Sequence, residues 1–272
     1  MWSRLLTVVA LAHGISAQNA GGTGPFRPAT HTTAPTLPNH TIYHPTTAPN
    51  TTLPVLLWGN GACSADGTAF LNLLTQLASH GVFVIASGAP SGKGSTTSAV
   101  MKEGLEWIGK LEGGVYNGMK LALDRVGVAG QSCGGVEAYD VIGDKRVGVL
   151  GVFNSGLMTE AESKRVVPGL GGKKVFYFLG GKSDIAYANG ERDYTLLPAG
   201  TPSWKGNLPV GHGGTYGDKD AGKFGVAAVH FVNWLLRGNA TSASFFTTGN
   251  EAKAAGWEVE SKNLDAIKVT PI

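Results

Sequence analysis

The sequence RVGVAGQSCGGVEAYDV, residues 125–141, places three structural signals in a row. An apolar run of strand length leads into the pattern G-x-S-x-G, formed by Gly130, Ser132 and Gly134, and a helical segment follows from about Val136. In such a turn the serine backbone is strained, and the glycines let strand and helix pass closely without a Cβ clash. The hydroxyl then projects beside helix N–H groups, which favour developing negative charge. We predict that Ser132 is a nucleophile; in a chain with 41 glycines, the alternative is a plain glycine-rich turn.

The segments around this turn alternate between strand and helix patterns. Apolar runs of strand length are PVLLW (54–58), VFVIAS (82–87), RVGVLGVF (146–153) and KKVFYFLG (173–180). Helical patterns include TAFLNLLTQLASHG (68–81), AVMKEGLEWIGKL (99–111) and KFGVAAVHFVNWLLRG (223–238). This alternation predicts an α/β fold with a mostly parallel sheet and helices on both faces. In residues 19–54, aromatic and β-branched residues alternate with turn formers, which favours edge strands over a glycosylated linker.

Composition limits the classes of partner. A length of 272 residues suits one sizeable domain. Only 15% of residues are charged and the formal net charge is +3, so the sequence argues against binding to nucleic acid or to an anionic membrane. We expect a monomer that needs no metal or organic cofactor.

The first 17 residues have the pattern of a secretory signal. Arg4 precedes an apolar run from Leu5 to Ala12, and small residues end at a cleavage site near Ala17. The apolar run is too short to span a bilayer. We therefore predict a signal peptide at 1–17, one domain at 18–272 and an extracellular location; the alternative is a disordered or membrane-anchoring N-terminus.

Three sequons and two cysteines agree with secretion. The sequons predict N-glycosylation at Asn39, Asn50 and Asn239. In an oxidising compartment, Cys63 and Cys133, the only cysteines of the chain, become candidates for one disulfide.

A serine nucleophile requires a base, which we find by elimination among seven histidines. His212 lies in a loop before the last long helix, where flanking glycines let its imidazole reach inward. The other histidines lie in the signal segment, in the N-terminal region, at a helix end or on the solvated face of the last helix: His13, His31, His40, His44, His80 and His230. We predict that His212 is the base; the alternative is a turn histidine exposed to water.

The third group of such a site is an acid that orients the histidine. Asp184 lies just beyond a strand end, where α/β folds place functional groups. Asp193 and Glu191 are the alternatives, but they lie farther from the strand among polar residues. The order Ser132, Asp184, His212 is the nucleophile, acid, histidine order of α/β-hydrolases.

Five stretches together resemble a known group of proteins. They are LPVLLWGNG, LASHGVFVIAS, VGVAGQSCGG, FLGGKSDIAY and GHGGTY. Over residues 40–237 the chain is similar to secreted α/β-hydrolases of the dienelactone-hydrolase and cutinase-like esterase superfamily, most closely to fungal members and distantly to bacterial polyester hydrolases. The resemblance implies an α/β-hydrolase fold without a large lid domain, a catalytic triad of Ser132, Asp184 and His212, and oxyanion donors at Asn60 and Cys133. Cys133 stands where polyester hydrolases usually carry methionine.

The loop WGNGACSADG (58–67) gives independent reasons for an oxyanion hole. In this topology the loop after the first core strand approaches the serine turn, and Gly59 and Gly61 leave the backbone around Asn60 bare; the alternative is a tight turn. Both cysteines then lie beside the same hole. We predict a Cys63–Cys133 disulfide, with two buried thiols as the alternative.

The preferred hypothesis is a secreted serine ester hydrolase that works through an acyl-enzyme on a small-molecule or polymeric ester. The alternatives are a non-catalytic binding or surface protein on the same fold, and a peptidase or acyltransferase with the same triad. Tyr187, Trp204 and Tyr216 lie in the loops that carry Asp184 and His212, where they form a possible substrate pocket or pack those loops.

Overall fold

The fold is described for residues 21–272 of a computed structural model. The predicted signal peptide at 1–17 lies outside the described residues. The strands are β1 (Ala29–Ala34), β2 (Leu37–Pro45), β3 (Leu53–Gly59), β4 (Phe83–Ser87), β5 (Val115–Tyr116), β6 (Met119–Gln131), β7 (Val147–Phe153), β8 (Lys174–Leu179), β9 (Ser203–Asn207) and β10 (Glu258–Lys262). The helices are α1 (Leu71–Ser79), α2 (Ser98–Gly109), α3 (Cys133–Val141), α4 (Glu160–Val166), α5 (Tyr187–Leu196), α6 (Gly222–Leu235), α7 (Ala240–Thr247) and α8 (Asn250–Ala254).

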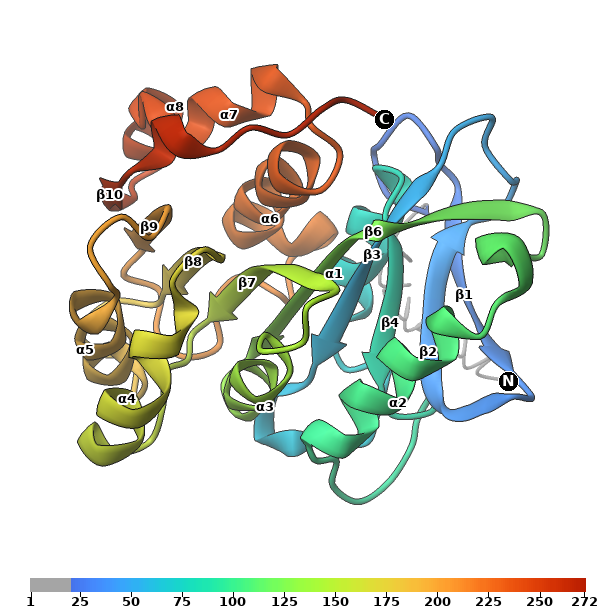
Figure 1. Ribbon diagram of the computed structural model, residues 1–272, viewed down its shortest axis with the longest axis horizontal. Helices are drawn as coiled ribbons and strands as arrows, with labels where there is room; N and C mark the ends of the chain where they lie inside the picture. Colours follow the sequence, from blue (N-terminus) through green and yellow to red (C-terminus); the bar gives the residue numbers. More distant parts are fainter. Residues whose placement is uncertain (1–20) are drawn as a thin grey trace, which may run out of the picture.

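The strands form one ten-stranded sheet in the order β1-β2-β4-β3-β6-β7-β8-β9-β10, with β5 paired to β6 outside this path (Figure 1). The central strands β4, β3, β6, β7, β8 and β9 run parallel to one another. At one edge β1 pairs antiparallel with β2, and β2 pairs antiparallel with β4; at the other edge β10 pairs antiparallel with β9. The predicted α/β class with a mostly parallel sheet is therefore confirmed, as are the edge strands predicted within residues 19–54.

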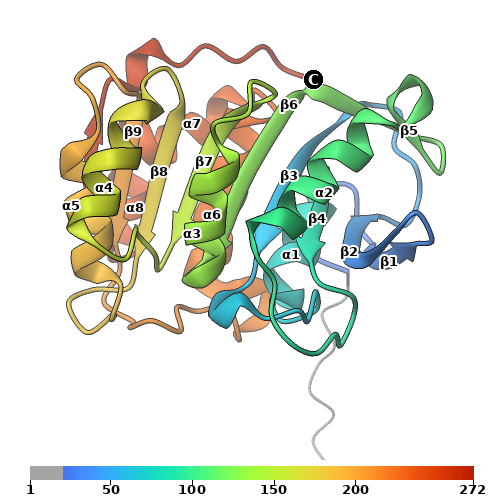
Figure 2. The ribbon, with the colours of Figure 1, turned by 60° about the horizontal axis from the view of Figure 1, so that its bottom comes forward.

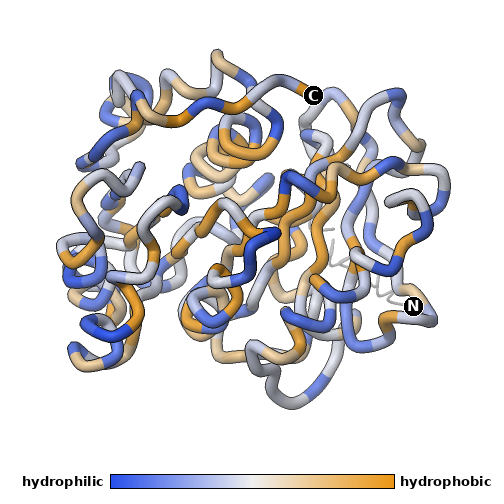
Figure 3. Tube along the Cα trace, in the orientation of Figure 1, coloured by the Kyte–Doolittle hydropathy of each residue, from blue (hydrophilic) through white to orange (hydrophobic). Residues whose placement is uncertain are grey.

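Helices cover both faces of the sheet, as Figure 2 shows. Side chains along each strand alternate between two hydrophobic cores because successive residues of a strand point to opposite faces. On β8, for example, Phe176 and Phe178 pack in the core that includes α1 and α6, whereas Tyr177 packs in the core that includes α2 and α3. The central strands are thus apolar on both sides, and apolar residues follow them closely in Figure 3.

The register of the sheet brings several strand ends to one edge. Gly59 pairs with Gly130, Gln131 with Phe153, and Phe153 with Phe178. Because these strands are parallel, the residues that follow β3, β6, β7 and β8 emerge side by side at the carboxyl edge of the sheet. Within residues 21–272, no helix is both long and apolar enough to cross a bilayer.

Candidate active site

Ser132 occupies the sharp turn between β6 and α3. Its backbone has φ 53° and ψ −118°, in a region that side-chain-bearing residues rarely adopt. The turn forces the start of α3 against the end of β3: a Cβ on Gly134 would overlap the backbone of Gly59, and a Cβ on Gly130 would overlap that of Gly134. The glycines of the G-x-S-x-G pattern are therefore required by contact as well as by backbone freedom.

The three side chains predicted to act together lie in one chain of hydrogen bonds. The His212 Nε2 atom is 2.9 Å from the Ser132 Oγ atom, and His212 Nδ1 is 2.6 Å from Asp184 Oδ1. A carboxylate only accepts hydrogen bonds, so Nδ1 carries the imidazole proton and Nε2 accepts from the serine hydroxyl. This is the tautomer in which a histidine can take a proton from serine.

The Asp184 carboxylate is buried, with 3% of the residue exposed, and each of its oxygens has two donors. Besides His212, Oδ1 accepts from the Ala186 N–H at 2.8 Å. Oδ2 accepts from the Gly180 N–H at 3.1 Å and from the Asn154 amide at 2.9 Å. These donors come from the loop after β8 and from the residue that follows β7, and together they fix the orientation of the carboxylate toward His212.

The two alternative acids have other roles. Asp193 is fully buried and accepts hydrogen bonds from Tyr139, Ser163 and the Leu157 N–H, and burial raises its pKa. Glu191 pairs with Lys205 at 2.8 Å. Neither carboxylate contacts His212, so the structure brings only Asp184 to the histidine.

The loop after β3 lies against the serine turn. The Asn60 side chain is fully buried and donates to the carbonyls of Ser64, Asp66 and Ser87, which fixes the loop. The Gly134 N–H donates to the Asn60 carbonyl at 3.0 Å. Within residues 21–272, neither the Asn60 N–H nor the Cys133 N–H donates to a group of the chain. Cys133 lines the cavity beside Ser132, whereas Asn60 is fully buried directly behind the serine turn.

A disulfide joins this loop to the serine turn. Cys63, in the 3₁₀ turn Gly61–Cys63, is bonded to Cys133, with 5.1 Å between their Cα atoms. The predicted disulfide is therefore confirmed, in place of two buried thiols. Glu137 lies beside it, and these three residues are the one group with metal-ligand spacing in the described part of the chain. As long as the sulfurs are bonded to each other they are not thiolates, so this group cannot hold a metal in the way that reduced cysteines do.

A cavity of about 360 Å³ opens beside Ser132. Its walls carry Val136 from α3, Met158 from the loop after β7, and Ile185 from the loop after β8. Met158 and Ile185 are 67% and 81% exposed, so they form an apolar rim. Ser155, Gly156, Ala186 and Asn189 complete the lining together with Ser132, Cys133 and His212. The rim residues were not predicted from the sequence; the signal that could have revealed them is their position in the loops that follow β7 and β8.

The three aromatic residues predicted to form a possible pocket do not line this cavity. Trp204 is fully buried on β9 and packs against Phe178 and Phe246. Tyr216 is buried and donates to the Asn154 side chain at 2.6 Å, while Tyr187 begins α5 and packs on a hydrophobic core. Of the two alternatives for these rings, the structure shows packing and not the lining of this cavity: sequence proximity to Asp184 and His212 did not determine where the rings point.

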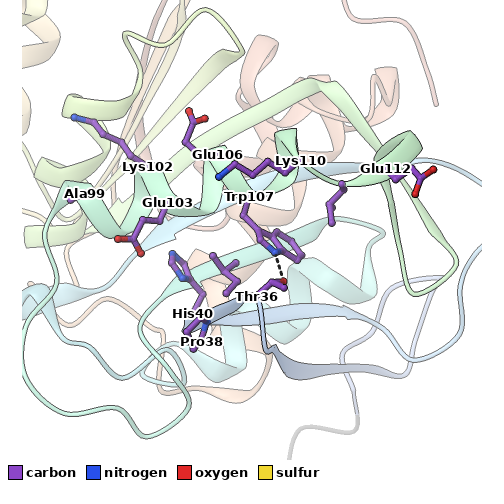
Figure 4. A pocket seen from close by; sticks show the side chains of 12 residues that line it. Thr36, Pro38, His40, Ala99, Lys102, Glu103, Glu106, Trp107, Lys110 and Glu112 are labelled. Atoms are coloured by element: carbon purple, nitrogen blue, oxygen red, sulfur yellow. Dashed lines mark hydrogen bonds between the residues drawn. The ribbon is translucent and has the colours of Figure 1, made fainter.

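A larger groove of about 870 Å³ lies elsewhere, between α2 and β2 (Figure 4). Its residues include His40, Glu106 and Trp107, and the Trp107 indole donates to Thr36 at 2.9 Å. The His40 ring is buried and forms a hydrogen bond with the Val100 carbonyl, and burial lowers the pKa of His40. No hydroxyl in this groove is hydrogen-bonded to a histidine among the described residues, so its size does not make it the candidate active site.

The asparagines of the three sequons, Asn39, Asn50 and Asn239, are exposed. Asn239 also caps α7, because its side-chain oxygen accepts from the N–H groups of Thr241 and Ser242. This capping uses the oxygen and leaves the amide nitrogen, the atom that carries a glycan, without a role in the cap.

Comparison with known proteins adds no family to this geometry. No family model matches the chain, and no curated protein is similar to it.

Proposed function

We propose that this protein is a secreted serine ester hydrolase with an α/β-hydrolase fold. The observation that carries the proposal is the continuous hydrogen-bonded chain from Ser132 through His212 to Asp184. An isolated serine hydroxyl is a weak nucleophile at neutral pH, and this arrangement supplies the base and the acid that activate it.

The sheet supports the fold assignment. The serine turn follows the central strand β6, and the acid and the histidine follow in chain order on later connections at the same sheet edge. The disulfide and the apolar start of the sequence support secretion, because disulfides persist mainly in oxidising compartments.

In the proposed mechanism, His212 Nε2 removes the Ser132 proton while Oγ attacks the ester carbonyl carbon. The N–H groups of Asn60 and Cys133 donate to the oxygen that becomes negatively charged. The tetrahedral intermediate then expels the alcohol, which takes its proton from His212 and leaves an acyl group on Ser132. Water attacks this acyl-enzyme with His212 again as the base, which releases the carboxylic acid and restores the serine.

The cavity beside Ser132 suits an uncharged acyl group. Its walls are mainly apolar, and among its described lining residues His212 is the one ionisable side chain. A charged substrate would lose hydration there without a partner of opposite charge. The site therefore fits neutral esters, whether small molecules or parts of a polymer.

The test is hydrolysis of p-nitrophenyl acetate by the secreted, disulfide-bonded protein, compared with Ser132→Ala and with Ser203→Ala as a control serine away from the cavity. We expect the Ser132 variant to lose at least about 10³-fold in kcat/KM. A fluorophosphonate probe should add its mass to the peptide that contains Ser132. Equal hydrolysis by the wild type and Ser132→Ala, or cleavage of anilides in preference to the matching esters, would contradict the proposal.

A further inference from the structure

Asn154 connects the acid, the histidine loop and a buried tyrosine. It is the first residue after β7 and is completely buried. Its amide nitrogen donates to Asp184 Oδ2 at 2.9 Å and to the Gly211 carbonyl at 3.2 Å. Gly211 immediately precedes His212, so one amide group holds both partners of the short hydrogen bond between Asp184 and His212.

The orientation of this amide is set by its other neighbours. The Tyr216 hydroxyl donates to Asn154 Oδ1 at 2.6 Å, which leaves the NH₂ group facing the two acceptors. Burial raises the pKa of Tyr216 well above its ordinary value, and the nearby Asp184 charge adds to this effect, so the hydroxyl remains a donor. The backbone of Asn154 has φ 43°, a left-handed conformation that asparagine tolerates better than most residues, and its N–H donates to the Phe178 carbonyl.

We propose that Asn154 is a positioning residue of the reaction, which holds Asp184 and the Gly211–His212 loop in register and is itself oriented by Tyr216. This inference rests on the proposed hydrolase function. Asn154 is not itself a lining residue of the cavity, and its side chain has no hydrogen bond to Ser132, so it acts through Asp184 and His212.

Gln131 provides a comparison within the same site. Its side-chain amide donates to the His212 carbonyl at 3.0 Å, so it holds the histidine loop as well, but from β6 and without contact to Asp184. Loss of Gln131 therefore loosens the loop alone, whereas loss of Asn154 also removes a donor from the acid.

The first test removes the amide without changing the backbone preference. Asn154→Gly keeps the left-handed conformation and deletes both hydrogen bonds that the amide donates, together with the acceptor of the Tyr216 hydroxyl. We expect kcat to fall by about 10- to 100-fold, as for a lost hydrogen bond to a charged group, with KM nearly unchanged because the cavity wall is intact. A wild-type kcat in a folded Asn154→Gly protein would overturn the proposal.

The second test uses Asn154→Asp, which preserves the shape of the side chain. It keeps the proposal testable if the glycine variant does not fold. Two adjacent carboxyl groups share a proton at low pH, and the shared proton replaces the lost N–H donor; at higher pH the proton leaves and the two charges repel. The titratable groups that face this pair are His212 and Tyr216. The ratio of variant to wild-type kcat should therefore fall as pH rises, and a ratio independent of pH would count against positioning of the acid.

A matched pair of tyrosine variants tests the orientation of the amide. Tyr216→Phe should lower kcat by about 2- to 10-fold, as expected for one neutral hydrogen bond. Tyr139→Phe also removes a buried hydroxyl donor, in this case one that donates to the Asp193 carboxylate away from the site, and it should affect thermal stability without this effect on kcat. Equal kcat losses in both would indicate a general packing effect and would overturn the role of Tyr216.

A measurement independent of turnover separates this inference from the proposed function. The proton between His212 and Asp184 should give a far-downfield ¹H NMR signal in the wild type, assigned by its loss in Asp184→Asn. We expect Asn154→Gly to shift or broaden this signal, and Gln131→Ala to change it less, because Asp184 then keeps all of its donors. If the wild type fails to hydrolyse esters, the proposed function falls; an unchanged signal in Asn154→Gly overturns the positioning role whether or not the protein is an esterase.

Discussion

At the scale of single residues, burial and local charge determine how polar side chains behave. Tyr139, Asp193 and His80 lie in different parts of the structure, but burial is the main cause of the pKa shift of each side chain. For an acid, burial raises the pKa; for histidine it lowers the pKa, because the charged form is disfavoured in both cases. His80, at the end of α1, is the clearest example of the second kind.

His80 should make the protein less stable in mild acid. Burial lowers its pKa from 6.5 to about 4, and the positive charges of His230 and Arg237 add to the shift. The folded state therefore resists protonation more than the unfolded state, so the stability associated with neutral His80 is present above pH 6.5 and is lost as pH falls towards 4. We expect the Tm to fall less between pH 7 and pH 4.5 in His80→Gln than in the wild type, measured by circular dichroism. An identical fall in both proteins would show that His80 does not contribute.

At the scale of elements, the site depends on contacts between segments that are far apart in sequence. Three segments meet at one sheet edge: the loop after β3, the start of α3 and the loop that carries His212. The disulfide and the Gly134 N–H join the first two, and the Gln131 amide holds the third against β6. The geometry of the two free amides at Asn60 and Cys133 is thus a property of these connections rather than of either loop alone.

Loss of the disulfide should weaken both stability and catalysis. The bond closes a sequence separation of 70 residues, and removal of a bond of this kind costs about 2–5 kcal/mol in unfolding free energy. In the Cys63→Ser, Cys133→Ser double variant we expect this loss in denaturant unfolding, together with a lower kcat because the Asn60 loop is less firmly held. A thiol reductant should impair the wild type in the same way and leave the double variant unaffected. Full activity of the reduced wild type would contradict the proposed effect on catalysis.

The elements of this fold could largely be predicted from sequence, but the walls of the site could not. Parallel strands buried on both faces leave continuous apolar runs, and the serine turn leaves its glycines, so both were visible as patterns. His212 and Asp184 could be found because their positions in chain order are constrained by topology. Trp204 and Tyr216 could not be assigned in this way, because the direction of a side chain depends on packing of distant segments. Asn154 was missed for the same reason, although its place after a strand end was a signal.

Across the molecule, the three sequons do not all lie at the carboxyl edge of the sheet that carries Ser132. Asn50 precedes β3 and Asn239 follows α6, so both lie toward the opposite edge. Asn39 is close to the start of β2, where His40 pairs with Ser87 at the end of β4. Glycans on Asn50 and Asn239 would therefore leave the cavity open.

We expect the secreted protein to lose mass on treatment with an N-glycosidase, and we expect the Asn39→Gln variant, which retains the sequons at 50 and 239, to keep its kcat/KM for p-nitrophenyl acetate after this treatment. Single Asn→Gln substitutions at 39, 50 and 239 would show by mass spectrometry which sites are occupied. No mass change in protein secreted by a glycosylating host would contradict the glycosylation prediction. A large rise in kcat/KM after glycan removal would show that a glycan reaches the cavity.

The bond between Cys63 and Cys133 also determines what happens when the backbone is cut. Lys93 is exposed in the connection between β4 and α2, within the segment that this bond encloses. A trypsin nick after Lys93 would yield two polypeptides that remain covalently attached, and they would migrate as one band on a gel until a reductant is added. The nicked form would keep the β3 loop and the serine turn together, so proteolytic damage at this connection would not by itself release the halves of the site.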